Sequence, residues 1–208
     1  MIRLLLLLIG YAFGLIQNGY FYGKKHGIDI HTMGSGNVGA TNVLRVFGKK
    51  AGVLIMLCDM LKAFIPCFAV SLIFRDSPDL RYGYLMWTAL GTALGHNFPC
   101  YLKFKGVKGV ASAGGMLLAL DWRLFLILIA VFVLIVVLTK YVSLGSITVM
   151  ALFSIITVIF SRTGVYPLSP AAATEFNILC IAVGGLSIVR HAENIKRLVR
   201  GTENRIRL

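Results

Sequence analysis

Long apolar runs constrain this chain more than any other feature. The stretch LFLILIAVFVLIVVL occupies residues 124–138, and ITVMALFSIITVIF occupies residues 147–160. Only 14% of the 208 residues are charged, against about 25% in a soluble globular domain. A helix needs about 17–25 residues to cross a bilayer. The sequence therefore predicts an all-α integral membrane protein that forms a single transmembrane domain over residues 1–208.

The apolar segments predict the topology. Seven of them are expected to form membrane-spanning helices, at about residues 3–22, 51–74, 82–101, 108–120, 123–139, 143–161 and 174–190. The fourth is short and rich in glycine, a length that is also typical of re-entrant or buried segments. If all seven cross, fifteen of the 21 lysine and arginine residues fall on one face, which is predicted to be cytoplasmic. We therefore predict that the N-terminus lies outside.

The formal net charge of +13 is concentrated on the predicted cytoplasmic face. Because these basic residues flank apolar helices, we expect them to face anionic lipid headgroups of the bilayer, and no nucleic-acid partner is predicted. The short basic tail at about residues 196–208 is expected to bind lipid in this way. The histidines and cysteines show no metal-ligand spacing, so no metal site is predicted.

The stretch GSGNVGATN at residues 34–42 contains the pattern G-x-G-x-x-G. In a dinucleotide-binding enzyme this pattern lies inside a βαβ unit, which the surrounding apolar runs do not provide. Glycines also allow backbone N–H groups to turn toward one anion. Thr41 and Arg45 are four residues apart on the helix expected next, so both can reach the same phosphate. An ordinary glycine turn before an interfacial helix explains the stretch equally well.

A second polar stretch, GHNFPCYLKFKGVKGVAS, covers residues 95–112. Lys108 lies between Gly106 and Gly109, where its ammonium can meet an anion held by backbone amides. His96 is interpreted as a structural histidine whose partner is backbone, in preference to a catalytic residue. This stretch also falls on the predicted cytoplasmic face.

Two further residue pairs complete the candidates. His191 and Asn194 are three residues apart at the cytoplasmic end of the last predicted span, so they share a helix face. Asp59 and Lys62 lie within the second span, where ionisable residues are costly and are candidates for a function. Either this pair neutralises itself, or Lys62 adds positive potential beneath the site. We expect the three polar stretches to meet in one anion-binding site.

Taken in order, GSGNVGATNVLR, D-x-x-K, GHNFPxxLxFKGxKG, KYVSLGS and HAENIKRLxxGTE resemble the motifs of one family. They are similar to those of the membrane-integral acyl-phosphate:glycerol-3-phosphate acyltransferases, the PlsY family. The resemblance implies a multi-pass enzyme of the bacterial inner membrane with its active site on the cytoplasmic face. It also implies transfer of a fatty acyl group from acyl phosphate to the sn-1 hydroxyl of glycerol 3-phosphate, which gives lysophosphatidic acid and phosphate in phospholipid biosynthesis.

The sequence pattern and the resemblance together assign residue roles. Catalytic roles are predicted for Lys108, His191, Asn194 and Arg45. Substrate binding is predicted for Ser35, Gly36, Asn37, Gly39, Thr41, Lys62, Gly106, Gly109 and Ser143, with Ser146 as a competing assignment for Ser143. Either His191 or the phosphate of the acyl donor accepts the proton of the attacking hydroxyl. No metal, nucleotide, coenzyme A or other cofactor is expected, and the functional unit is expected to be a monomer.

Val107 departs from the family pattern FKGGKG, which has glycine at this position. If that glycine has a positive φ, valine does not fit and the loop around Lys108 changes its geometry. An alternative function is a membrane anion or phosphate transporter, or a lipid-phosphate-binding protein, that uses the same pocket. A transporter of this kind predicts two related halves of the sequence, and we find no convincing repeat.

Overall fold

The computed structural model describes residues 1–206, and all their regular structure is helical. The α-helices are α1 (Ile2–Gly14), α2 (Asn18–Lys25), α3 (Ala40–Phe47), α4 (Lys49–Ile73), α5 (Pro78–Asn97), α6 (Val110–Leu120), α7 (Trp122–Thr139), α8 (Val142–Arg162), α9 (Pro170–Arg190) and α10 (Ala192–Val199). Two short 3-10 helices are η1 (Ile30–Thr32) and η2 (Cys100–Leu102). The predicted all-α class is confirmed for the described residues.

Five segments of the described chain are long and apolar enough to cross a membrane. They are Ile2–Lys25, Lys49–Ile73, Trp122–Thr139, Val142–Arg162 and Pro170–Arg190. α5 also has 20 residues but is less apolar. α6 has only 11 residues, which is shorter than a bilayer crossing requires. Large apolar side chains such as Leu126 and Leu138 are exposed on α7, as expected for a helix whose neighbour is lipid.

The first predicted span, residues 3–22, is not one continuous helix. α1 ends at Gly14 and α2 begins at Asn18. Side chains satisfy the carbonyl oxygens at the break. The Lys62 ammonium donates to the Ile16 carbonyl oxygen, and the Tyr101 hydroxyl donates to the Leu15 carbonyl oxygen. A break in a helix is tolerated at membrane depth when other groups satisfy the freed carbonyls. The predicted first span is therefore present as an apolar segment, Ile2–Lys25, with a break between α1 and α2 that the sequence did not predict.

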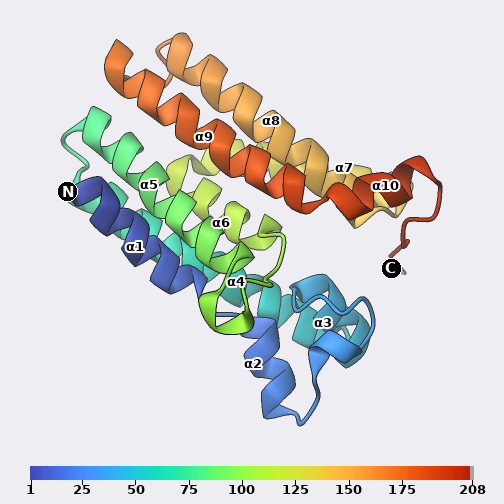
Figure 1. Cartoon of the computed structure of the whole chain (residues 1–208). Helices are drawn as coiled ribbons and strands as arrows, with labels where there is room; N and C mark the ends of the chain where they lie inside the picture. The colour runs from blue at the N-terminus through green and yellow to red at the C-terminus, as the bar shows by residue number, and fades with distance from the viewer. Residues whose placement is uncertain (207–208) are drawn as a thin grey trace.

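α1 and α5 lie side by side (Figure 1). Each contributes two glycines four residues apart, Gly10 and Gly14 on α1, and Gly91 and Gly95 on α5. A Cβ added at any of the four would overlap a backbone carbonyl oxygen of the opposite helix. Small residues at this spacing allow two helix backbones to approach closely in a membrane. The close contact makes α1 and α5 one packing unit.

The two ends of the described chain lie at opposite ends of the helical bundle (Figure 1). The short helices α2, α3 and α10 gather toward the end that carries the C-terminus. A small apolar cluster joins α3, α4 and the loop before α6; its buried members are Ile30, Val38, Val43, Ala51, Ile55 and Val107. This cluster brings the glycine-rich loop and the Lys108 loop, which are far apart in the sequence, to the same end of the bundle.

Candidate active site

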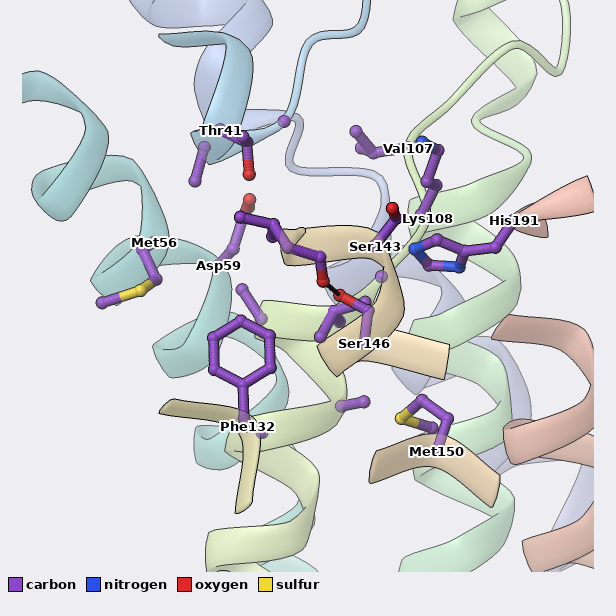
Figure 2. A pocket seen from close by; sticks show the side chains of 18 of the residues that line it. Thr41, Met56, Asp59, Val107, Lys108, Phe132, Ser143, Ser146, Met150 and His191 are labelled. Atoms are coloured by element: carbon purple, nitrogen blue, oxygen red, sulfur yellow. Dashed lines mark hydrogen bonds between the residues drawn. The ribbon is translucent and has the colours of Figure 1, made fainter. Parts of the chain in front are cut away.

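A cavity of about 290 Å³ begins beneath α3 and α10 and continues between α4, α6, α7 and α8. Its polar lining includes Ser35, Asn37, Thr41, Arg45, Lys108, Ser143, His191, Asn194, Arg197 and Glu203. Its apolar lining includes Met56, Met116, Leu117, Leu128, Phe132, Met150 and Phe153. Figure 2 shows Thr41, Lys108 and His191 toward one end of the cavity, and Phe132 and Met150 toward the other. The cavity is therefore amphipathic.

Residues from all three predicted polar stretches line this one cavity. Thr41 and Arg45 come from α3, Lys108 comes from the loop before α6, and His191 and Asn194 come from the end of α9 and from α10. The prediction that the three stretches meet is therefore confirmed. Thr41 and Arg45 share a face of α3, as their spacing of four residues predicts.

The glycine-rich loop is held together by its own side chains. The Asn42 amide oxygen accepts from the Ser35 backbone N–H at 2.8 Å, and the Asn37 amide oxygen accepts from the Gly39 N–H at 2.9 Å. The Gly36 N–H donates to a carbonyl within the loop. Three backbone amides are thus used within the loop and are not available to an anion. Asn42 is a loop-ordering residue that sequence reasoning missed.

The loop that carries Lys108 folds back on the end of α5. The Gly106 N–H donates to the Asn97 carbonyl, and the Val107 N–H donates to the His96 carbonyl, both at 3.1 Å. These two bonds fix the loop against α5. They place Lys108 directly beside the cavity.

Valine at position 107 fits this loop. At the end of this loop, Gly109 has a positive φ of 77°. Val107 does not have a positive φ. Val107 is 5% exposed, and a Cβ added at Gly39 would lie 2.8 Å from its Cγ1. The condition for a changed loop geometry, a positive φ at position 107, is therefore not met in this chain. Val107 instead packs the Lys108 loop against the glycine-rich loop.

The Lys108 ammonium donates to the Asn194 amide oxygen at 2.5 Å. Burial, together with the nearby Arg197 guanidinium, lowers the pKa of Lys108 to about 8, and Glu203 acts in the opposite direction. Since a neutral amide is its hydrogen-bond partner, the positive charge of Lys108 is not cancelled by a direct ion pair. This arrangement suits a cation that binds an incoming anion.

Glu203 is a site residue that the sequence reasoning did not select. Its carboxylate accepts from Asn194 Nδ2 at 2.8 Å, from Arg197 Nε at 2.8 Å and from Ser143 Oγ at 3.1 Å. Its side chain is 6% exposed. Gly201, with φ 68°, turns the chain back toward the cavity after α10. Arg197 therefore faces the cavity, which corrects the expectation that the whole basic tail contacts lipid headgroups.

His191 presents a hydrogen-bond acceptor to the cavity. Its Nδ1 lies 2.8 Å from the Ser187 carbonyl oxygen. A carbonyl oxygen only accepts, so Nδ1 carries the proton and Nε2 keeps a lone pair. Burial lowers the pKa of His191, so the ring is neutral at pH 7. Among the described residues, the Nε2 atom has no protein partner.

Both candidate serines on α8 line the cavity (Figure 2). The Ser143 hydroxyl donates to Glu203, whereas the Ser146 hydroxyl donates to the Val142 carbonyl at 2.8 Å. Ser143 thus belongs to the polar network around Asn194. Ser146 lies one helical turn farther from it and is bonded to its own helix.

Three predicted substrate-binding residues, Gly36, Gly106 and Lys62, do not line the cavity. A Cβ on Gly106 would overlap the His96 carbonyl oxygen, and its own carbonyl accepts from Arg190. Lys62 is buried in α4, and its ammonium is used by protein partners. A role of these three residues in substrate binding stays a prediction, and the contacts described here favour a structural role for Gly106 and Lys62. The other predicted residues, including Gly39 and Gly109, line the cavity.

The model of one family, described as glycerol-3-phosphate acyltransferase, matches residues 4–201. This chain belongs to the glycerol-3-phosphate acyltransferase family. The glycerol-3-phosphate acyltransferases of Thermotoga petrophila and Aquifex aeolicus are each 40% identical to it over 202 residues, which cover 97% of this chain and 95% and 98% of those proteins. As a family member, the protein is an acyltransferase of phospholipid synthesis, which decides against the transporter alternative.

Two solved structures have the same fold. Both are of PlsY, an integral membrane glycerol 3-phosphate acyltransferase, one in the glycerol 3-phosphate form and one in the lysophosphatidic acid form. Each is 37% identical to this chain and covers 99% of it, with TM-scores of 0.83 and 0.81. This chain covers 96% and 95% of them. The resemblance to the PlsY family is confirmed, and the protein is a multi-pass membrane protein.

Proposed function

We propose that this acyltransferase uses acyl phosphate as its donor and acylates the sn-1 hydroxyl of glycerol 3-phosphate, which gives lysophosphatidic acid and inorganic phosphate. The amphipathic cavity carries this proposal. Acyl phosphate joins a phosphate directly to a long apolar chain. Such a molecule matches a cavity with Lys108 toward one end and Phe132 and Met150 toward the other (Figure 2). Glycerol 3-phosphate is wholly polar and fits only the cationic end.

Three cations at the polar end are available for two phosphates. Arg45, Lys108 and Arg197 all line the cavity. The hydrogen-bond partner of Lys108 is the neutral amide of Asn194, whereas Arg197 forms an ion pair with Glu203. In this proposal Lys108 and Arg45 hold the phosphates, because charge-assisted hydrogen bonds to phosphate are stronger than neutral ones. The Thr41 hydroxyl adds a donor at the same end, whereas the Ser143 hydroxyl donates to Glu203.

The reaction needs orientation and charge stabilisation because the donor is already activated. The sn-1 oxygen attacks the acyl carbonyl carbon, the bond from that carbon to the phosphate oxygen breaks, and phosphate leaves. Lys108 and Arg45 stabilise the negative charge on the departing phosphate. Asn194 and the Nε2 lone pair of His191 hold glycerol 3-phosphate so that its hydroxyl points at the carbonyl carbon.

The hydroxyl proton passes to an oxygen of the departing phosphate in this mechanism. The carboxylates beside the cavity are occupied: Glu203 accepts three hydrogen bonds, and Asp59 accepts from Asn18 and pairs with Lys62. A His191→Ala variant is therefore expected to keep measurable activity, with a higher KM for glycerol 3-phosphate. Complete loss of turnover in a folded His191→Ala variant would make histidine the obligate base.

The membrane arrangement belongs to the same proposal. Seven crossings with the N-terminus outside, counting α5 and the short α6 as two of them, would put the polar end of the cavity at the cytoplasmic face of the bacterial inner membrane, where soluble glycerol 3-phosphate is available. The opposite positions of the two chain ends support an odd number of crossings (Figure 1). The mechanism above uses residues of a single chain only, so the proposal takes a monomer as the functional unit. The basic residues at this face are then placed against anionic headgroups.

The donor is tested with purified protein in detergent. The protein is given glycerol 3-phosphate with either acyl phosphate or acyl-coenzyme A of the same chain length, and both phosphate and lysophosphatidic acid are measured. We expect equal amounts of the two products from acyl phosphate only. Lysophosphatidic acid from the coenzyme A thioester alone would overturn the proposed donor.

The topology is tested by cysteine labelling in a cysteine-free background. Lys50 lies in the first turn of α4, Lys196 lies in α10, and Asp76 lies in the loop between α4 and α5. All three native residues are exposed, and each is replaced by cysteine in turn. An impermeant thiol reagent applied to intact cells is expected to label only Asp76→Cys. Labelling of Lys50→Cys and Lys196→Cys from outside would contradict a cytoplasmic site.

A further inference from the structure

His96 and Lys62 form a buried pair that the phosphate site does not explain. Lys62 Nζ, on α4, lies 2.7 Å from His96 Nδ1, near the end of α5. Lys62 is 5% exposed and His96 is 3% exposed. The expectation of a backbone partner for the His96 side chain is wrong, because its Nδ1 contacts an ammonium. An ammonium at this position determines which ring nitrogen of His96 carries the proton.

The contacts of Lys62 fix the direction of this hydrogen bond. Its ammonium lies 2.5 Å from the Ile16 carbonyl oxygen and 3.2 Å from Asp59 Oδ1. Carbonyl and carboxylate oxygens only accept, so Nζ is the donor in both contacts. The Gly14 carbonyl oxygen, at 3.4 Å from Nζ, is a further acceptor, so the three N–H groups are shared among four acceptors. An ammonium has no lone pair, so Nζ is also the donor in its contact with His96 Nδ1. His96 Nδ1 is therefore the acceptor, and the proton of the neutral ring is on Nε2.

The Nε2 side of the His96 ring faces the cavity. His96 lines the cavity, and so do Lys108 and Gly109. A Cβ built on Gly109 would lie 3.4 Å from His96 Cδ2, the ring carbon bonded to Nε2. Among residues 1–206, Lys62 is the only side-chain partner found for the ring, and it uses Nδ1. The Nε2–H group is thus a free donor beside the Lys108 loop.

We propose that His96 Nε2–H donates a hydrogen bond to a phosphoryl oxygen of the substrate in the cavity, and that Lys62 is the positioning residue that fixes the ring tautomer. A preorganised donor in a site shielded from water stabilises negative charge effectively. His191 has the opposite tautomer, with a lone pair on Nε2. One histidine therefore offers a donor for an anionic oxygen, and the other offers an acceptor for a hydroxyl. This inference rests on the proposal that the cavity is the acyl-transfer site.

Two variants of similar size distinguish loss of the His96 Nε2–H donor from a general effect on folding. His96→Asn keeps an acceptor near Nδ1 for Lys62 but has no group that reaches the Nε2 position. His96→Gln places an amide N–H near that position. We expect His96→Asn to lower kcat/KM by about 100-fold, as loss of one preorganised donor does, and His96→Gln to recover most of that loss. The control His26→Asn, at an exposed position, is expected to match the wild type. Wild-type kcat and KM in His96→Asn would overturn the proposal.

The phosphoryl group that receives the bond follows from the kinetic pattern. If the KM for glycerol 3-phosphate rises, His96 contacts the phosphate of glycerol 3-phosphate. If the KM for acyl phosphate rises, His96 contacts the phosphate of acyl phosphate. A lower kcat with unchanged KM values assigns a contact formed only in the transition state. A purely structural change lowers the amount of folded enzyme and leaves the KM values unchanged, so kcat is calculated per folded enzyme. A rise in either KM, or a lower kcat per folded enzyme, then supports a donor role.

Nitrogen-15 NMR of the histidine rings tests the tautomer without relying on turnover. The His96 signals are assigned by their absence in the His96→Gln spectrum. We expect unprotonated Nδ1 and protonated Nε2 in the wild type, and a shift of the Nε2 signal on addition of glycerol 3-phosphate or inorganic phosphate. A proton on Nδ1, or an Nε2 signal that neither phosphate changes, would overturn the proposal. If the wild type makes no product from acyl phosphate, the proposed function fails, and the NMR result still decides the role of His96.

The positioning role of Lys62 is tested in a double variant. Lys62→Met alone would leave the buried Asp59 carboxylate unpaired, which is costly for reasons unrelated to His96. Lys62→Met is therefore combined with Asp59→Asn. We expect this pair to give a mixture of His96 tautomers and a loss of kcat/KM that is not additive with His96→Asn. A single Nε2–H tautomer in the pair, or additive losses, would contradict the positioning role.

Discussion

The Lys108 ammonium lies 2.5 Å from the Asn194 amide oxygen and joins two segments that are 86 residues apart in the sequence. Asn194 in turn donates from its amide nitrogen to Glu203. The amide thus separates the cation from the carboxylate. Lys108 is oriented by a hydrogen bond yet keeps its charge for a phosphate, and Asn194 controls where that charge is placed.

The pKa of Lys108 predicts how activity depends on pH. Burial lowers this pKa to about 8 from an ordinary value of 10.5. The protonated form binds phosphate, so kcat/KM for glycerol 3-phosphate should be constant below about pH 8 and fall as pH rises above it. A bound phosphate stabilises the ammonium, so kcat should fall only at higher pH. Steady-state rates from pH 6.5 to 10 measure both profiles, because kcat/KM reports the free enzyme.

Lys108→Arg is the control for this profile. A guanidinium stays protonated over the whole range, so its kcat/KM should show no fall near pH 8, although its absolute value is lower because the geometry differs. Lys108→Ala should lose at least about 100-fold in kcat/KM. An unchanged high-pH fall in Lys108→Arg would assign the titration to another group.

Glu203 is predicted to be needed for both stability and substrate binding. Glu203→Ala leaves Asn194, Arg197 and Ser143 without their carboxylate partner. Loss of a partner for partly buried polar groups costs about 1–3 kcal/mol. We expect a lower unfolding midpoint in detergent and a KM for glycerol 3-phosphate raised at least about 10-fold. Glu193→Ala is the control, since Glu193 is 72% exposed and pairs only with Lys196 among the described residues; a similar effect there would contradict the role of Glu203.

Gly39 and Val107 are predicted to be energetically coupled. Gly39 has φ −80°, which any residue adopts, but an added Cβ would lie 2.8 Å from Val107 Cγ1. Gly39→Ala should therefore destabilise the wild type by about 1–3 kcal/mol through overpacking. It should cost less in a Val107→Ala background, with a coupling energy of about 0.5–3 kcal/mol. Denaturant titrations in mixed micelles measure the free energies of unfolding of the two single variants and the double variant. As a control, the losses of stability caused by Gly39→Ala and the distant Val70→Ala should be additive.

The sequence predicts the helices of this protein well because long apolar runs leave few alternatives. The helices from α4 to α9 correspond to the predicted segments, with modest shifts at their ends. The meeting of Arg45, Lys108 and His191 was also predictable, since charge asymmetry assigns their loops to one face. These predictions depend on local composition and on the parity of the spans.

Other features depend on contacts between distant segments and leave no local signal. The break between α1 and α2 is stabilised by Lys62, 46 residues beyond Ile16. Glu203 enters the site only because Gly201 reverses the chain after α10. Val107 is accommodated because the positive φ falls two residues later, at Gly109. Each outcome follows from tertiary packing, which spacing along the chain does not encode.

The contact between α1 and α5 predicts a sharp difference between two helical glycines. A Cβ at Gly91 would overlap the Leu7 carbonyl oxygen and lie 2.9 Å from the Tyr11 nitrogen, whereas a Cβ at Gly185 on α9 would meet nothing within 4 Å. Gly91→Ala must push α1 away from α5, so we expect it to lower the free energy of unfolding by about 1–3 kcal/mol. Gly185→Ala should leave it unchanged or raise it by up to about 1 kcal/mol, because alanine favours a helix. Unfolding of both variants in the same detergent measures the difference, and equal stabilities would show that the two helix backbones do not touch.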